Sequence, residues 1–278
     1  MKTFSVILVC LLFSFAALAQ KLNVDLYAGA ANYLGDLQDK NYTFAQAHFA
    51  GGAGLTYDLT DKFSIRGGVM FSRLSADDKF GRNNARNLNF TTNIVEGHLG
   101  LQYYITRLED HALTPYVFGG LALYHINPYT FDTTGKKFFL QPLGTEGQGF
   151  TTGVSDYKLT NFAIPFGGGV KLSLAENLNV GLEFGFRKTF TDYLDDVSSD
   201  YVDQASLFAN RGADAVELAF RGDELKNGAT YPAAGTTRGG AKNKDMYYFT
   251  TLTASYRLGN LFGGGGGRSK KYGCPVAF

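Results

Sequence analysis

The chain has 278 residues, and its 26 Lys and Arg residues nearly balance 25 Asp and Glu residues, which leaves a formal net charge of +1. This balance provides no basic excess of the kind that nucleic-acid binding requires. Glycine is abundant at 35 residues while charged residues make up only 18%, a composition that fits a membrane barrel better than a soluble enzyme.

The first predicted element is a signal peptide at residues 1–19. Lys2 provides the positively charged N-terminal region, residues 4–15 form the apolar core, and the Ala17-Leu18-Ala19 sequence is typical of a cleavage site. We therefore expect an exported mature chain that begins at residue 20. Cleavage removes one of the two cysteines, so no internal disulfide can form. No later stretch approaches the ~20 apolar residues that a membrane helix needs.

Eight strands follow, separated by alternating short and long connections. The predicted strands cover residues 22–33, 48–57, 63–74, 88–105, 116–127, 162–174, 178–187 and 246–258. Short connections with long, polar ones between them are typical of bacterial outer-membrane barrels, which have short periplasmic turns and long outer loops. The predicted fold class is therefore all-β: an eight-stranded antiparallel transmembrane β-barrel with long extracellular loops, located in the cell outer membrane.

The clearest alternation lies in residues 162–174 and 178–187. Large apolar residues occupy every second position, with glycine, polar or charged residues between them. Period two indicates strands with two different faces. We predict that Phe166 and Leu182 face lipid, and that the inward neighbours Gly167 and Gly181 tolerate serine.

Charged residues gather on the predicted inner face. By parity these are Asp25, Arg66, Glu96, His98, Lys171, Glu183, Arg187 and Arg257. An eight-stranded barrel is barely wide enough for its own side chains, and buried charges need partners. The predicted arrangement is a plug of paired charges, in which Glu183 and Arg187 join Arg66, Glu96 or Arg257. A proton or ion path is the alternative interpretation.

The long loop at residues 192–245 contains two patterns of its own. Residues 192–200 contain four carboxylates, interpreted here as solvated turn and capping residues, with a calcium site as the alternative. Further on, Asp214 and Glu217 have the spacing of a capping box and predict a short helix. The Gly-rich segment 140–149 is expected to form an ordinary loop over the barrel mouth.

The predicted domain organisation has three parts. Residues 1–19 are the signal peptide, residues 20–260 the barrel, and residues 261–278 a Gly-rich periplasmic tail. The tail carries Lys270, Lys271 and Cys274 after five consecutive glycines. We predict that these three residues contact a partner protein. An unpaired cysteine in an oxidising compartment could also form an intermolecular disulfide.

The sequence contains no catalytic, cofactor-binding or metal-ligating motif that we can assign. A zinc site needs several ligands, and the four histidines are not spaced along the chain as zinc ligands are. A lipid-modifying enzyme remains an alternative, because His48, His125, Ser72 and Ser75 lie near the predicted outer ends of their strands. Such an enzyme needs a nucleophile, a base and an orienting acid.

Short motifs distributed over the mature chain resemble a known family. They are YLGDL at 33–37, TPYVFGG at 114–120, LQPLGTEGQG at 140–149, IPFGGG at 164–169, FTDYLDDVS at 190–198 and KYGCP at 271–275. Together they resemble the Bacteroidota outer-membrane barrels that include PorG of the type IX secretion and gliding machinery. The resemblance implies periplasmic ring partners of the PorK and PorN type, and it carries over no catalytic residue.

The expected function is therefore a non-enzymatic one. The wall would fix the protein in lipid, and the turns and tail would hold periplasmic proteins of a type IX-like secretion machine. A surface ligand-binding or adhesin-type barrel is the main alternative, because the 192–245 loop is long.

Overall fold

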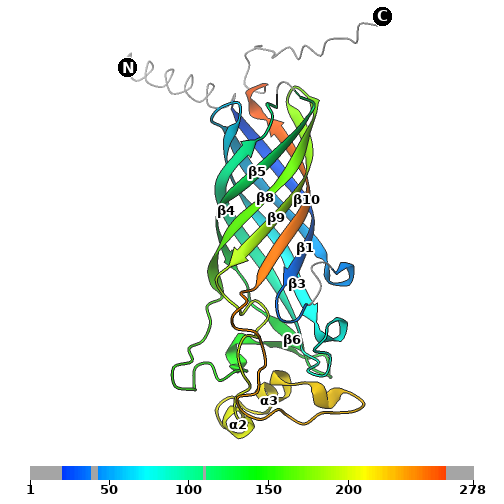
Figure 1. Ribbon diagram of the computed structural model, residues 1–278, viewed down its shortest axis with the longest axis vertical. Helices are drawn as coiled ribbons and strands as arrows, with labels where there is room; N and C mark the ends of the chain where they lie inside the picture. The colour runs from blue at the N-terminus through cyan, green and yellow to red at the C-terminus, as the bar shows by residue number, and fades with distance from the viewer. Residues whose placement is uncertain (1–20, 39–42, 109–110, 261–278) are drawn as a thin grey trace, which may run out of the picture.

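The computed structural model describes residues 21–38, 43–108 and 111–260, and these form a closed barrel (Figure 1). The barrel strands are β1 (Leu22–Leu34), β2 (His48–Asp58), β3 (Phe63–Asp77), β4 (Asn89–Tyr104), β5 (Leu113–His125), β8 (Thr160–Ala175), β9 (Leu178–Thr189) and β10 (Met246–Arg257). Each strand pairs antiparallel with the next, and β1 pairs with β10 to close the ring. The predicted eight-stranded antiparallel barrel is confirmed.

The two ends of the barrel differ in the length of their connections. Residues 59–62, 105–112 and 176–177 form short connections at the end where β1 begins and β10 ends. Residues 35–47, 78–88, 126–159 and 190–245 form the long connections at the opposite end. In Figure 1 the short connections lie at the top, while α2, α3 and β6 lie below the barrel. We call these the turn end and the loop end.

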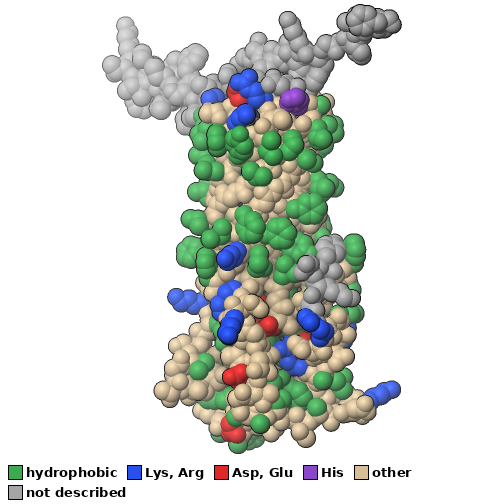
Figure 2. Space-filling model, viewed as in Figure 1, with side chains coloured by type: hydrophobic (Ala, Val, Ile, Leu, Met, Phe, Trp, Pro, Cys, Tyr) green, Lys and Arg blue, Asp and Glu red, His purple; other side chains and the backbone are tan. Residues whose placement is uncertain are grey.

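The outer face of the barrel wall is apolar. Exposed large side chains alternate with buried ones along the strands, as in β8, where Phe162 is 65% and Phe166 is 43% exposed while Ala163 is buried. Leu182 and Phe184 continue this face on β9. Figure 2 shows hydrophobic side chains gathered over the barrel. This is the belt that a wall in contact with lipid acyl chains requires.

Among the residues that the structure describes, no helix is long and apolar enough to cross a membrane.

Glycines on the inner face allow neighbouring strands to approach closely, which corrects one prediction. A Cβ added to Gly167 would lie 2.0 Å from the carbonyl oxygen of Phe184, and one added to Gly181 would lie 2.5 Å from that of Val170. Backbone atoms cannot move aside as a flexible side chain can. The expectation that these two positions tolerate serine is therefore wrong.

The loops contain more regular structure than the sequence indicated. They form a small hairpin, two helices and four short 3-10 turns: β6 (Tyr129–Phe131), β7 (Lys137–Phe139), α2 (Gln204–Arg211), α3 (Ala213–Ala219), η1 (Phe44–Gln46), η2 (Asp78–Phe80), η3 (Gln141–Leu143) and η4 (Gly222–Glu224). A further 3-10 turn, η5 (Leu258–Asn260), follows β10. The hairpin is joined to the wall where Tyr129 pairs with Thr91 of β4.

The predicted helix is present, but its capping box is not. α3 begins at Ala213, so Asp214 lies inside its first turn, and the N-cap Gly212 has no side-chain cap. The capped helix is α2, which the sequence analysis did not predict. There Asp203 accepts a hydrogen bond from the backbone amide of Ser206, the usual N-cap contact.

Candidate functional site

The interior of the barrel is filled by paired charges and tyrosines. On β3, Arg66 lies 2.6 Å from Glu183 of β9 and also donates to the second carboxylate oxygen at 3.1 Å. The hydroxyl of Tyr116 donates to the same carboxylate at 2.8 Å, and Tyr27 accepts from Arg66 at 3.2 Å. Both charges are almost fully buried, so each depends on the other for its electrostatic stabilisation.

A second pair lies closer to the loop end. Arg187 donates to both oxygens of Glu96 at 3.0 Å, and the hydroxyl of Tyr247 donates to Glu96 at 2.8 Å. His98 Nδ1 lies 3.3 Å from the same carboxylate. Since Glu183 and Arg187 are both on β9, this one strand links the two pairs.

The remaining charges assigned to the interior have other partners. Lys171 donates to the hydroxyl of Tyr104 at 3.2 Å, and Asp25 accepts from Thr56 at 2.5 Å and from Ser255. Arg257 lies apart from the two central pairs. It is only partly buried and pairs at 3.1 Å with Asp58 at the turn end.

Little free volume remains between these side chains. A cavity lined by Arg66, His98, Phe118 and Arg187, together with wall residues of β4, β5 and β8, measures about 10 Å³. That is about the minimum that accommodates one water molecule. At this level the interior is therefore filled by the side chains of the two ion pairs.

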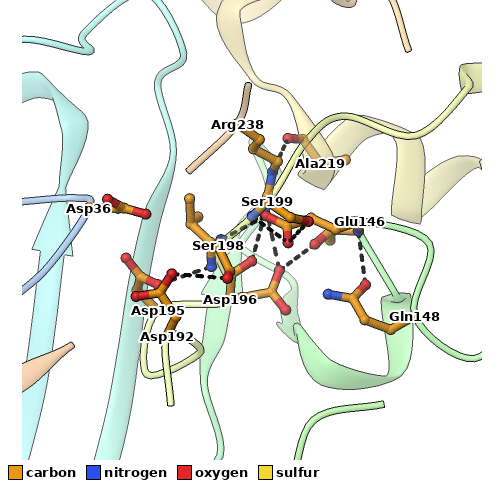
Figure 3. Close-up of polar contacts among 12 residues, drawn as sticks. Asp36, Glu146, Gln148, Asp192, Asp195, Asp196, Ser198, Ser199, Ala219 and Arg238 are labelled. Carbon is orange, nitrogen blue, oxygen red and sulfur yellow. Dashed lines mark hydrogen bonds and ion pairs between the residues drawn. The ribbon is translucent and has the colours of Figure 1, made fainter. Parts of the chain in front are cut away.

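The loop end is closed by a cap in which buried and half-buried charges from four connections meet. Figure 3 shows part of it, including Asp36, Glu146 and Arg238. Its residues are Asp36, Asp78, Arg86, Glu146, Asp192, Asp195, Asp196, Arg238 and Asp245. The carboxylates of 192–196 lie inside this cap, with Asp192, Asp195 and Asp196 each 1% exposed. Their interpretation as solvated turn residues is therefore wrong, while Asp200 alone among the four is exposed.

Arg238 and Glu146 form the centre of the cap. Arg238 lies 2.8 Å from Glu146 and donates to the backbone carbonyls of Asp196 and Ala219. Glu146 also accepts from the backbone amides of Ser198 and Ser199, at 2.8 and 3.0 Å. The Gly-rich segment 140–149 is thus tied to both ends of the 190–245 connection.

A tyrosine joins the cap to the wall. The hydroxyl of Tyr33, near the end of β1, lies 2.5 Å from Asp195 and 2.9 Å from Asp245. A hydroxyl has one proton and donates to one acceptor at a time. The second contact is therefore a hydrogen bond only when one of the two carboxyl groups is protonated and donates to the tyrosine oxygen.

Burial gives these cap carboxyl groups a preference for the neutral form. It raises the pKa of Asp195 and of Asp245 well above the usual range, and for Asp245 the nearby Asp195 adds to the effect. Burial also raises the pKa of Asp192 to about 6. The pKa of Asp196 is likewise raised to about 6, because burial outweighs the opposing charge of Arg238.

The acidic residues of the cap do not form a metal centre. Their partners are arginines, hydroxyls and backbone amides, and no group of three or more His, Cys, Asp or Glu among the described residues could hold a metal ion. The calcium alternative for residues 192–200 therefore has no support in this part of the chain.

Two of the histidines considered for catalysis lie at the loop end of the wall. His48 Nε2 lies 2.7 Å from Ser75 Oγ, and His125 Nδ1 lies 2.9 Å from Thr160 Oγ1. Within the described chain, no carboxylate hydrogen-bonds to His48. The pair thus has a nucleophile and a base in contact, without the orienting acid that activates such a pair.

The predicted partner-contact residues Lys270, Lys271 and Cys274 lie outside the described residues, as do the predicted signal peptide and the rest of the predicted tail.

Sequence reasoning missed the basic half of the cap. Arg86 and Arg238 come from different loops and have no local pattern that marks them. The one available signal was the acidic segment 192–200 itself, which lacks any basic residue and therefore needs cations from elsewhere in the chain if it is buried.

Solved structures of the same general architecture have low sequence identity to this chain. Neisserial surface protein A (NspA) is 11% identical, with 85% of this chain and 97% of that chain covered and a TM-score of 0.41. The attachment invasion locus protein Ail of Yersinia pestis is 8% identical over 84% and 96%, with a TM-score of 0.40. OprG of Pseudomonas aeruginosa is 10% identical over 86% and 97%, with a TM-score of 0.39. No curated protein matches the chain in sequence.

The closed ring of eight strands, its apolar outer belt and its polar interior define an outer-membrane-type β-barrel. This assignment follows from the strand pairing and the two faces of the wall. The family model described as "Domain of unknown function (DUF6089)" matches residues 1–214, and the chain belongs to that family.

Proposed function

We propose that this chain is a non-enzymatic anchor in the outer membrane that holds periplasmic proteins, as an assembly component of a type IX-like secretion machine. The observation that carries the proposal is the filled interior, in which Arg66–Glu183 and Arg187–Glu96 occupy the space that a transport path needs. A barrel without a path acts through its surfaces. The lipid-facing belt then supplies the attachment to the membrane.

The turn end is the surface available to periplasmic partners. It carries an exposed ion pair between Arg107 and Asp61 at 2.8 Å and the half-buried pair between Arg257 and Asp58. The tail follows directly after η5. The resemblance to barrels of the PorG family supports ring proteins of the PorK and PorN type as partners.

The proposal is tested by removing residues 263–278 and measuring co-purification of the partner. The last barrel strand ends at Arg257, so the truncated chain keeps all eight strands and should insert normally. We expect the partner to be lost. Cys274→Ser is the matched variant: partner retention shows a non-covalent contact, and loss shows a disulfide. A truncated chain that captures the partner at wild-type yield excludes the tail and leaves the short connections as candidates.

A second candidate is a surface ligand-binding or adhesin-type barrel, and the cap favours it. Residues 201–236 form an excursion that includes α2 and α3, and Asp200 pairs with Thr237 at its base. The excursion packs on the other loops, where Ala219 accepts from Arg238 and Arg211 donates to the carbonyl of Gln148. Phe208 on α2 is 60% exposed. Replacing 201–236 with two glycines should leave partner capture intact. The adhesin function is the correct one if the wild-type chain captures no periplasmic partner and the shortened chain loses binding to an external surface.

A further inference from the structure

The apolar belt ends abruptly at the loop end of β3 and β4. Three successive cross-strand pairs share the outward face there: Phe71 with Val95, Arg73 with Asn93, and Ser75 with Thr91. The first pair is exposed and apolar, at 54% and 43%. The next two pairs are polar, so the surface changes character within one step along the strands, about 7 Å.

Arg73 is the exposed cation at this boundary. Its Nε donates to Asn93 Oδ1 at 3.3 Å, and its two terminal amino groups make no hydrogen bond to any described residue. Beside it, His48 and Ser75 form their 2.7 Å contact. Arginine presents a planar set of donors that matches phosphate oxygens.

A second cation reaches the same face from the β6–β7 hairpin. Tyr129 pairs with Thr91, and the amino group of Lys137 lies 3.6 Å from the centre of the Tyr129 ring. It also lies 4.6 Å from the ring of Phe139, which is itself exposed. Neither Arg73 nor Lys137 forms an ion pair with a carboxylate of the described chain.

We propose that this surface, the Arg73 patch (His48, Arg73, Ser75, Asn93 and Lys137), binds the phosphate-bearing headgroup of an anionic membrane lipid. Its position beside Phe71 and Val95 places a headgroup on the cations while the acyl chains continue along the belt. Two cations without a carboxylate partner supply the charge complementarity, and Ser75 and Asn93 add neutral hydrogen-bonding groups. On the face shown in Figure 2, Lys and Arg side chains lie toward both ends of the barrel, including the loop end.

The site goes beyond the proposed anchoring role, since it would select particular lipids whether or not a periplasmic partner is bound. It also accounts for the arrangement of the hairpin, which has no place in the ring of barrel strands yet brings Lys137 to the wall. A free phosphate ion would use the same donors but would gain nothing from the adjoining apolar surface.

The test compares lipid binding by the full chain and by the Arg73→Gln/Lys137→Gln variant. Native mass spectrometry in mixed micelles measures the preference for phosphatidic acid over phosphatidylcholine with identical acyl chains. We expect wild-type protein to prefer phosphatidic acid, and the double variant to lose about 10- to 30-fold of that preference. Arg73→Lys retains the charge and should retain most of the preference.

Lys226→Gln/Lys242→Gln is the matched control, because both lysines are exposed and lie in the 190–245 connection, outside the barrel strands. Its preference should stay within about twofold of wild type. The proposal is overturned if the Arg73→Gln/Lys137→Gln variant keeps the wild-type preference, or if the control loses it equally. Displacement of phosphatidic acid by an equal concentration of inorganic phosphate would indicate a free-anion site and would overturn it too.

Discussion

Arg66 and Glu183 are 117 positions apart in the chain, yet they form a bidentate ion pair inside the barrel. Each charge is costly to bury alone, and the pair is tolerable because the partner and Tyr116 compensate for lost water. The interior is therefore sensitive to the removal of one member and less sensitive to the removal of both.

We predict that Arg66→Met lowers the free energy of unfolding by about 3–5 kcal/mol, because Glu183 is left buried without its counter-ion. Arg66→Met/Glu183→Met should recover much of that loss. Denaturant titration of the barrel in lipid measures both. The exposed pair supplies the control, since Arg107→Gln should cost only about 0–1 kcal/mol. Equal costs for the two single variants would show that the interior pair is not buried from water.

The cap carboxyl groups predict a dependence of cap stability on pH. A carboxyl group whose pKa is raised by folding holds its proton in the closed cap and releases it more easily when the cap opens. The resulting stability is present below the unfolded pKa and is lost as the pH rises through the folded pKa. For Asp192 and Asp196, that window extends from about 4, the unfolded pKa, to about 6.

We therefore expect backbone amides of 192–198 to exchange hydrogen more slowly at pH 4.5 than at pH 7.5, after correction for the intrinsic exchange rate. Asp245→Asn should reduce this dependence, because it removes one of the carboxyl groups with a raised pKa and its amide can donate to Tyr33 without binding a proton. Amides in the middle of β9 serve as the internal reference. Faster corrected exchange of the cap at pH 4.5 would contradict the assigned direction of the pKa shifts.

At the scale of the element, the inner glycines set how closely strands pack. We predict that Gly167→Ala strongly reduces the yield of folded barrel, because its Cβ would meet the Phe184 carbonyl oxygen at 2.0 Å. Gly97→Ala on β4 is the matched control, since no heavy atom lies within 4 Å of its added Cβ. Heat-modifiable migration on gels reports the folded fraction. Normal assembly of Gly167→Ala would mean that β8 and β9 are not so closely spaced.

The strands were predictable because alternation is a local property of sequence. In β8 and β9, residues two positions apart lie on the same face of the strand, so the alternation of apolar and small or polar residues shows which face each one occupies. Phe166 and Leu182 were therefore correctly predicted to point outward. The cap was not predictable in this way. Asp195 is buried because Tyr33 and Asp245 approach it from distant positions, and neither contact has a periodic signature.

The helices show the same limit on a smaller scale. Asp214 and Glu217 had the right spacing for a capping box, but Gly212 separates two consecutive short helices and takes the N-cap position itself. The β6–β7 hairpin escaped prediction because each of its strands has three residues, too few for alternation to be recognised.

For the whole molecule, the wall, interior and cap have separate tasks. The wall contacts lipid, the two ion pairs fill the interior, and the buried cap closes the loop end. In the two proposals made above, the turn end binds a partner and the loop-end wall binds lipid headgroups. A barrel built in this way fits the proposed anchor better than it fits a pore.

The measurement that tests this account most directly is the conductance of the purified full-length protein in a planar lipid bilayer. Insertion is verified independently by protease protection, and a known porin in the same bilayer provides the positive control. We predict a current no greater than that of the bare bilayer, because Arg66–Glu183 and Arg187–Glu96 occupy the path. A large, stable open-channel current from the wild-type protein would contradict the account and assign a transport function to the barrel.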